Sequence, residues 1–211
     1  MKSENLVFIL SILLITLSFI IFLLIFFENP EVIHKFTGYV STNYGYINLS
    51  VLTFVSINLS VDSVSWGVGT INAGENNATL YTVGNNSAVV QRGNWSVINV
   101  SAFVIENIGN LNCSISVQSG KNAHDFFNSL TSSNEQYKFN VSNKEVGSCI
   151  GSSLNTWVDV NKTSGGTKFC NNFGFKKNNN EIYIDVLLTV PYDAGNIGQQ
   201  SDVIVITGDA V

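Results

Sequence analysis

Hydrophobic residues form two different patterns along this chain, and each pattern predicts a different kind of structure. In the first, from Leu6 to Phe27, 22 successive residues include no charged side chain. In the second, from Ile47 to Val61, apolar residues occupy most odd positions, and Asn or Ser occupies most even positions. A continuous apolar run favours a membrane-spanning helix, whereas alternation with a period of two is typical of a strand with one buried face.

The run from Leu6 to Phe27 has the length of a membrane-spanning helix. Its 22 residues, at about 1.5 Å each, extend roughly 33 Å, which matches the ~30 Å hydrocarbon core of a bilayer. The hydroxyls of Ser11, Thr16 and Ser18 can donate hydrogen bonds to helix carbonyls, so they do not exclude the segment from lipid. We therefore expect residues 1–30 to form an amino-terminal anchor that binds the lipid bilayer through Leu6–Phe27.

The residues that flank the apolar run indicate its fate and its orientation. A cleaved signal peptide has a shorter apolar region followed by a small-residue cleavage site, and Glu28–Glu31 lacks such a site. The sequence therefore predicts an uncleaved signal anchor, with a removed signal peptide as the alternative. Lys2 precedes the run, whereas Glu28 and Glu31 follow it, a weak bias that favours a cytoplasmic amino terminus. Residues 31–211 are then the extracellular domain of a single-pass protein of the cell membrane.

Alternating apolar and polar residues recur through the rest of the chain and predict a mainly β domain. Further strands are expected at Ile98–Val104, Leu111–Val117, Tyr137–Val141, Ile182–Val190 and Val203–Thr207. The run from Ile47 to Val61 exceeds the usual strand length of about 3–10 residues, and a bend near Phe54 is expected to divide it. Many short strands separated by turns imply an antiparallel β-sandwich of the immunoglobulin-like or jelly-roll-like kind.

The segments between these strands predict turns, loops and one short helix. Asn and Gly in Glu106–Asn110 favour a hairpin turn, and Pro191–Gly198 turns the chain after the long strand. Asn122–Leu130 is expected to form one or two helical turns. Ser142–Ser153 and Asn161–Asn180 are interpreted as loops.

The composition narrows the function classes. Charged residues make up 12% of the chain, about half the ~25% typical of soluble domains, and Asn, with 28 residues, takes their place. The 10 Lys and Arg residues are scattered, so the clustered positive charge of a nucleic-acid binder is absent from the sequence. An apolar content of 45% argues against a disordered chain, and 3 Cys are too few for a disulfide-rich miniprotein.

Sites for N-glycosylation are frequent in the predicted extracellular domain. Asn-x-Ser/Thr occurs at Asn48, Asn58, Asn77, Asn85, Asn94, Asn99, Asn112, Asn140 and Asn161. The polar, outward phase of the predicted strands contains Asn48, Asn58, Asn99, Asn112 and Asn140. This register predicts a glycoprotein. The alternative is that Asn serves simply as an uncharged polar surface residue.

The cysteines predict one disulfide. Cys113 shares the inward phase with Leu111 and Ile115, and is therefore expected to be a buried thiol. Cys149 and Cys170 lie in the two predicted loops, so a Cys149–Cys170 bridge is the expected pairing in an oxidising exterior. By the chain-entropy model such a loop stabilises the fold by roughly 3 kcal/mol.

Several short motifs resemble those of surface proteins. They are Val64–Gly74, Glu106–Ser114, Trp157–Asn161 and Val186–Gly195. They resemble a group of small, uncharacterised surface proteins from archaea with reduced genomes, and the immunoglobulin-like modules of microbial envelope proteins. The layout, an apolar amino-terminal segment followed by a β domain, is also distantly similar to the sandwich subunits of matrix fibres. The resemblance implies an extracellular β-sandwich on a membrane anchor and transfers no catalytic or binding residue.

Candidate catalytic and metal-binding groups are few. The chain has 2 His, His34 and His124, and the sequence contains no zinc-site spacing. Gly147–Gly151 has the form G-x-C-x-G, which with His124 as a base could suggest a cysteine hydrolase. A loop closed by a disulfide is the favoured interpretation, because a nucleophile elbow needs a strand before it and a helix after it. We therefore predict no catalytic residue and no cofactor.

Two further binding sites were considered. Asp193, Asp202 and Asp209 could bind calcium, but they lack the dense spacing of a calcium loop, and solvated carboxylates are favoured. A sugar-binding surface is the second possibility, and its candidates are Trp66, Trp95 and Trp157. Large core or edge residues of the predicted domain account for these better. No metal site is predicted.

Together these patterns favour a membrane-anchored, N-glycosylated surface protein with a structural or adhesive role. Its expected partners are the bilayer, further copies of itself or other envelope proteins, and not nucleic acid. The alternative is a filament subunit, assembled either through the apolar helix as in a pilin or by strand addition to an exposed sheet edge. An envelope enzyme or a carbohydrate-binding module is the third possibility.

Overall fold

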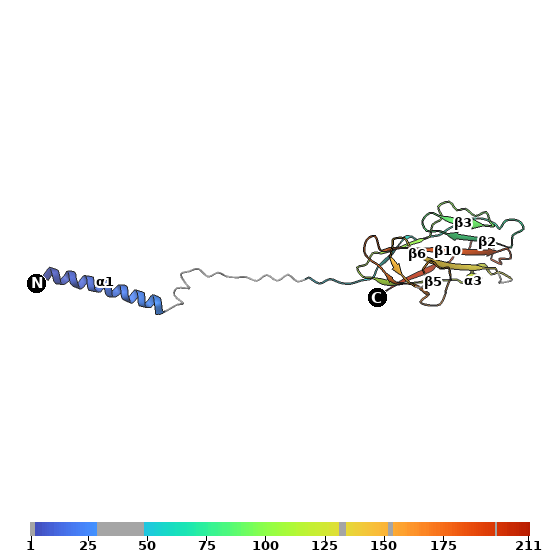
Figure 1. Ribbon diagram of the computed structural model, residues 1–211. Coiled ribbons are helices and arrows are strands. Elements are labelled where there is room, and N and C mark those ends of the chain that lie inside the picture. The colour runs from blue at the N-terminus through green and yellow to red at the C-terminus, as the bar shows by residue number, and fades with distance from the viewer. Residues whose placement is uncertain (1–2, 29–48, 131–133, 152–153, 197) are drawn as a thin grey trace. The chain divides into compact units, whose positions relative to one another are not determined.

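The structure is a computed structural model that describes residues 3–28, 49–130, 134–151, 154–196 and 198–211 (Figure 1). The chain divides into two compact units, Met1–Ser50 and Val51–Val211. The described residues of the first include the helix α1, and the second is a β domain. The predictions for Asn48 and for the stretch that follows Glu28 fall outside the described residues.

The helix of the first unit, α1, spans Ser3–Glu28 and includes the whole predicted apolar run. Its Val7–Leu24 portion is long and apolar enough to cross a bilayer. The hydroxyls of Ser11 and Thr16 donate to the carbonyls of Phe8 and Leu13 at 2.8 Å and 3.0 Å. These bonds satisfy the hydroxyls within the helix, as the sequence predicts. Such a helix fits either a single-pass membrane anchor or a signal sequence.

The second unit contains antiparallel strands in two sheets. The larger sheet consists of β1 (Ile57–Val61), β2 (Asn77–Thr82), β3 (Ala88–Gln91), β4 (Phe103–Asn107), β6 (Gln136–Asn143), β8 (Val158–Asp159) and β10 (Glu181–Pro191). The smaller sheet has the order β11-β5-β9-β7, where β5 is Cys113–Ser119, β7 is Cys149–Ile150, β9 is Thr167–Phe173 and β11 is Ile204–Ala210. The fold class predicted from the sequence, mainly antiparallel β with an amino-terminal helix, is confirmed at this level.

Strand β10 organises the larger sheet. Strand β6 pairs along one edge of β10, from Ile182 to Thr189. Strands β4 and β2 share the opposite edge, β4 at Glu181–Ile184 and β2 at Leu187–Pro191. Asp185 lies at the junction between them.

The Asp185 carboxylate satisfies backbone and hydroxyl groups at this junction. It accepts hydrogen bonds from the Thr82 hydroxyl at 2.9 Å and from Gly84 N–H at 2.8 Å. The Thr82 hydroxyl in turn accepts from Val186 N–H at 2.9 Å. A chain of hydrogen bonds therefore spans the point along β10 where the neighbouring strand changes from β4 to β2.

The core lies where the two sheets contribute buried side chains to one cluster. Its largest fully buried side chains come from both sheets, and they include Phe139, Ile105 and Ile182 of the larger sheet and Phe169, Phe173 and Ile115 of the smaller one. Their alternation along the strands is the period-two pattern seen in the sequence. The domain is thus stabilised by burial of apolar surface from both sheets.

One short helix, α3, covers part of this core. It spans Ala123–Phe127, within the predicted Asn122–Leu130. Asn122 caps it, because its side chain accepts from Asp125 N–H while the Asp125 side chain accepts from Asn122 N–H. This cap holds the buried Phe126 and Phe127 against the strands.

Several predicted connections differ in the structure. The turn at Glu106–Asn110 is not a hairpin, because it carries the chain from β4 in the larger sheet to β5 in the smaller one. The strand predicted at Ile98–Val104 begins only at Phe103, since Asn99 adopts a positive φ of 60° and turns the chain. The prediction of a loop over Asn161–Asn180 is wrong, because β9 lies within it and pairs with both β5 and β7. Alternation is weak in β9, where Phe169 and Cys170 are both buried.

Candidate functional site

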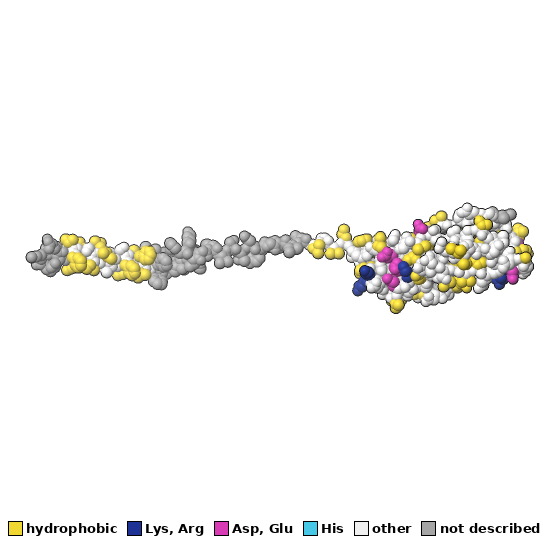
Figure 2. All heavy atoms as spheres, turned by 90° about the horizontal axis from the view of Figure 1, so that it is seen from above, with side chains coloured by type: hydrophobic (Ala, Val, Ile, Leu, Met, Phe, Trp, Pro, Cys, Tyr) yellow, Lys and Arg dark blue, Asp and Glu magenta, His cyan; other side chains and the backbone are white. Residues whose placement is uncertain are grey.

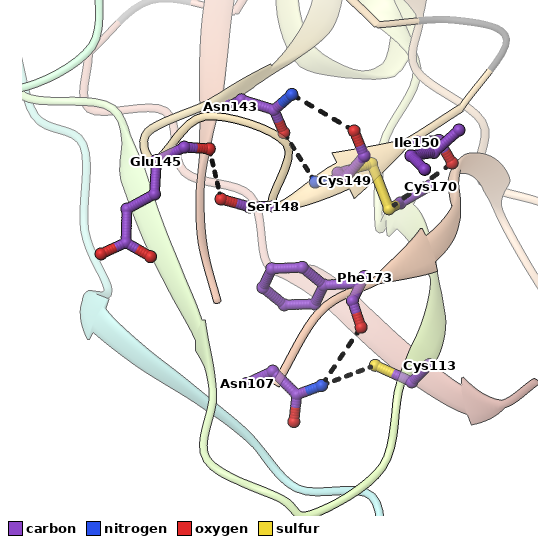
Figure 3. Close-up of a disulfide and its surroundings, with 9 residues drawn as sticks. All are labelled: Asn107, Cys113, Asn143, Glu145, Ser148, Cys149, Ile150, Cys170 and Phe173. Atoms are coloured by element: carbon purple, nitrogen blue, oxygen red, sulfur yellow. Dashed lines mark hydrogen bonds between the residues drawn. A yellow bond between two sulfur atoms is a disulfide. The ribbon is translucent and has the colours of Figure 1, made fainter. Parts of the chain in front are cut away.

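The disulfide predicted from the sequence joins Cys149 of β7 to Cys170 of β9, with Cα atoms 5.6 Å apart (Figure 3). The Asn143 side chain brackets Cys149: its Oδ1 accepts from Cys149 N–H at 2.7 Å, and its Nδ2 donates to the Cys149 carbonyl at 3.2 Å. An amide side chain thus continues the backbone pairing of the short strand β7. Both sulfur atoms are in the disulfide, which ties β7 to the smaller sheet.

Asn107 lies close to this bridge and connects the two sheets (Figure 3). It is 1% exposed at the end of β4, and its Nδ2 donates to the carbonyls of Leu111 at 3.0 Å and of Phe173 at 3.4 Å. Its Oδ1 accepts from Gly109 N–H at 3.0 Å. A buried polar group so satisfied stabilises the turn from β4 and links it to β9.

Cys113 is the free, buried thiol that the sequence predicts. It is 0% exposed, and Asn107 Nδ2 lies 3.6 Å from its sulfur. Burial, together with the nearby Asp209 carboxylate, raises the pKa of Cys113 to about 11. The thiol is therefore protonated at neutral pH and a poor nucleophile. We call the region of Asn107, Cys113, the disulfide and Phe173 the closed end of the domain.

The domain also contains a large cleft, with a volume of about 1090 Å³. Its apolar wall comes from the larger sheet and α3, and includes Leu80, Leu188 and Phe126. Loop residues between Val64 and Glu75 and between Gly198 and Asp202 form much of the remaining lining, together with Ile204 at the start of β11. The lining also includes Trp95, Tyr192, Ala194 and Asn196. We call this region the cleft end. No sequence pattern predicts the cleft, because residues that line it are separated by more than a hundred positions in the chain.

Two of the three tryptophans line the cleft, and their packing fixes the loop that borders it. Trp66 is 8% exposed, and its Nε1 is buried without a hydrogen-bond partner. Trp95 packs so tightly between Gly69 and Gly93 that a Cβ at either glycine would lie within 3 Å of its ring. Trp157 does not line the cleft but packs edge-on against Tyr81, with ring centroids 6.3 Å apart. The structure therefore does not bring the three tryptophans together as one sugar-binding surface.

A buried phenol, Tyr137, and the Asp202 carboxylate lie together in the cleft lining. Burial raises the pKa of the Tyr137 hydroxyl, and the Asp202 carboxylate, which accepts a hydrogen bond from it, raises it further. Asp202 also accepts from Lys121 N–H at 3.2 Å. These contacts hold the chain that leads into β11 against β6.

The residues considered for cysteine hydrolase chemistry are engaged elsewhere. Cys149 is in the disulfide, and His124 Nδ1 lies 3.0 Å from Glu135 Oε1. The structure therefore does not pair the Cys149 sulfur with His124.

The three aspartates considered for calcium are likewise separate. Asp193 accepts from the Ser129 hydroxyl at 2.9 Å, Asp202 contacts Lys121, and Asp209 lies opposite Ser114 on β11. Among the described residues there is no group of three or more His, Cys, Asp or Glu side chains that could hold a metal ion.

The predicted glycosylation sites differ in exposure. Exposed asparagines are Asn58, Asn85, Asn94 and Asn99, whereas half-buried ones are Asn77, Asn112, Asn140 and Asn161. Asn161 Nδ2, the atom that would carry a glycan, donates to the Gly166 carbonyl at 3.3 Å. Asn77 and Asn140 each have a buried Oδ1 without a partner. The exposed four are thus the better acceptors, and occupancy of all nine remains a prediction.

Uncharged polar groups cover most of the face of the domain in Figure 2, and charged side chains gather in small groups. Comparisons of this chain with protein-family models, with curated proteins and with solved structures found no match.

Proposed function

We propose that this chain is a membrane-anchored surface protein with a structural or adhesive role, whose β domain lies outside the cell and carries N-linked glycans. The observation that carries the proposal is the disulfide Cys149–Cys170 in a domain that follows an apolar helix of membrane-spanning length. Structural disulfides persist mainly in oxidising compartments, so this pairing favours an exterior location.

The proposed architecture of the domain is an immunoglobulin-like or jelly-roll-like sandwich of its two sheets. A single cluster of buried side chains from both sheets supports it. The exposed Asn58, Asn85, Asn94 and Asn99 support glycosylation, because sugar acceptors need an accessible amide.

Topology is tested with a membrane-impermeant, amine-reactive label on intact cells. Lys176 and Lys177 are exposed in the β domain, and Lys2 precedes the apolar helix. The proposal expects Lys176 and Lys177 to react on intact cells and Lys2 to react only after lysis. The reverse order would overturn it. Mass spectrometry of the mature chain supplies the second readout: a retained amino-terminal peptide supports an anchor, and its loss supports a removed signal peptide.

A filament subunit is the second candidate function. The observation that favours it is a group of exposed apolar side chains where the described part of the β domain begins (Figure 2). Electron microscopy of native cell surfaces would separate single domains from polymers.

A further inference from the structure

The start of the β domain, Val51–Ser56, exposes three large apolar side chains, although Val55 packs against the core. Val51 is 72% exposed, Leu52 81% and Phe54 54%, although the alternation of the sequence predicts a strand there. We call Val51–Ser56 the leading segment. The segment precedes β1, which begins at Ile57. Its backbone bonds to the loop after β4: the Ser56 carbonyl accepts from Ile108 N–H at 2.9 Å, and the Phe54 carbonyl accepts from Asn110 N–H at 3.2 Å. Exposed apolar residues that adjoin one another in this way mark an interaction site.

Asn110 holds the leading segment at the closed end of the domain. Phe54 N–H donates to Asn110 Oδ1 at 2.8 Å, and Asn110 Nδ2 donates to the Leu52 carbonyl. In the pairing of β1 with β4, Ile57 lies opposite Asn107, whereas Val61 lies opposite Val104. The chain before Ile57 therefore runs past Asn107, away from the cleft end, where Phe103 lines the cleft.

The cleft lies beside an unpaired strand edge. In the described part of the domain, β11 pairs only with β5. Gly120 N–H donates to the Val203 carbonyl at 3.0 Å, so the odd residues of β11 direct their backbone groups toward β5. The backbone groups of Ile204 and Ile206 therefore point the other way, and Ile204 lines the cleft. An unpaired edge next to an apolar wall is a template for an added strand.

The leading segment matches the cleft in chemistry. Between Lys35 and Asp62 the chain has no charged residue, so a strand from this region places no charge against Glu75 or Asp202 of the cleft. Val51 and Leu52 are neighbours and would face opposite sides of an extended strand, toward the sheet wall and toward the loop wall. The cleft volume of about 1090 Å³ slightly exceeds the range of about 300–1,000 Å³ for small-molecule sites, which favours a peptide segment as occupant.

From this geometry we propose that the cleft, with the free edge of β11, is an acceptor for the leading segment of a second copy of this chain. The segment of the same copy is excluded, because its bonds to Asn110 hold it at the opposite end of the domain (Figure 1). The contact is heterologous: one end of each copy binds the other end of the next. Such contacts build open chains or rings of copies rather than two-fold symmetric dimers. This inference rests on the structural role given under "Proposed function", and it names a second copy of the chain as the partner in that role. It does not depend on which side of the membrane the domain faces.

Cross-linking of the full chain in a lipid bilayer tests the contact. The test variant carries Leu52→Cys in the leading segment and Val68→Cys at the rim of the cleft, where Val68 is 96% exposed. The native cysteines do not compete, since Cys113 is buried and the other two form the disulfide. A short bis-maleimide should produce a ladder of dimers, trimers and larger products. Each single-cysteine variant should give no ladder.

A substitution with a matched control completes the test. Val51→Asp in the cross-linking variant should reduce the ladder at least tenfold, because it buries a charge in the acceptor cleft. Val146→Asp changes the same residue type at a position that is 95% exposed and outside the cleft lining, and it should leave the ladder unchanged.

Three outcomes would overturn the proposed contact. A product confined to dimers would indicate a symmetric contact, and a cross-link within one copy would place the segment in its own cleft. Absence of any cross-link would show that the cleft has another occupant or none. Labelling of Lys176 only after lysis, together with a ladder, would overturn the surface location and leave this contact intact.

Discussion

The closed end and the cleft end of the β domain contain similar side chains but differ in what covers them. At the closed end, strands of the smaller sheet lie over the core, and the disulfide and Asn107 fasten them. At the cleft end, loops and the five-residue helix α3 take the place of strands. Strands cover a sheet face continuously, whereas loops leave a cleft. The comparison suggests that one end provides stability and that the other is free to bind.

A matched pair of phenylalanines gives the largest expected effect. Phe173→Ala at the closed end removes a side chain that is 0% exposed, and we expect the free energy of unfolding to fall by about 4 kcal/mol. Phe126→Ala at the cleft end should lower it by about half as much, because Phe126 already borders a cavity and its removal creates less new empty volume. Chemical denaturation of both variants measures the difference. Equal losses would contradict the contrast between the two ends.

The disulfide gives the next largest effect, again at the closed end. Replacing both Cys149 and Cys170 with Ser should destabilise the domain by roughly 3 kcal/mol, since the bridge closes a loop with a sequence separation of 21. Denaturant titration measures the change in the free energy of unfolding.

A control for this prediction uses the third cysteine. Cys113 should resist alkylation in the folded protein and react only after unfolding, because it is buried and its pKa is raised. Rapid alkylation of Cys113 in the native state would show that the closed end opens readily and would weaken the contrast.

Period-two alternation predicted the strands that form the centre of the fold, and it did so because their inner faces are buried. β6 and β10 closely match the predicted Tyr137–Val141 and Ile182–Val190. The burial of Cys113 also followed from its phase. The Cys149–Cys170 pairing is confirmed, although both cysteines lie in strands, β7 and β9, and not in the predicted loops. The local pattern was enough to predict burial and strands where a residue's environment depends on its neighbours in the sequence.

Prediction failed where an element's environment depends on distant parts of the chain. β9 was missed because its Phe169 and Cys170 are both buried, which breaks the alternation. The turn after Glu106 was taken for a hairpin, since no local signal shows that the next strand joins another sheet. The cleft was not foreseen at all, because loops from separate regions border it. The sites proposed for calcium and sugar grouped residues that the fold separates.

Substitution of Asn107 tests whether polar contacts contribute to the greater stability of the closed end. Asn107→Ala removes the amide that donates to the Phe173 and Leu111 carbonyls, and it should lower the free energy of unfolding by about 2 kcal/mol. It also removes one of the two acceptors of Gly109 N–H, which keeps its bond to the Ser56 carbonyl. Asn143→Ala is the control, because the exposed Asn143 side chain bonds to the backbone of nearby Cys149 and does not link β4 to β9. It should lower the free energy of unfolding by less than about 1 kcal/mol. Thermal or denaturant unfolding of the two variants gives the comparison. A larger loss of stability for Asn143→Ala would show that the contacts around the disulfide stabilise the closed end more than the contacts between the two sheets do.

The smallest expected effect concerns Asp185, at the junction between the two ends. Burial raises the pKa of this carboxyl, although the bonds from Gly84 and Thr82 oppose the shift. Because its folded-state pKa lies above the value of the unfolded chain, the folded protein binds the proton more tightly. The stability associated with this group is therefore fully present below the unfolded pKa and is lost as the pH rises through the folded pKa. Asp185→Asn keeps an oxygen acceptor for Thr82 and Gly84 and removes the titration.

The melting temperature of the Asp185→Asn variant should equal that of the natural chain in acid and exceed it slightly at neutral pH. Asp159→Asn is the matched control, since it makes the same chemical change at a side chain that is 82% exposed. A lower melting temperature for Asp185→Asn at neutral pH would mean that the junction needs the negative charge. In that case the charge-assisted hydrogen bonds from Thr82 and Gly84 would stabilise the ionised carboxylate by more than its burial destabilises it.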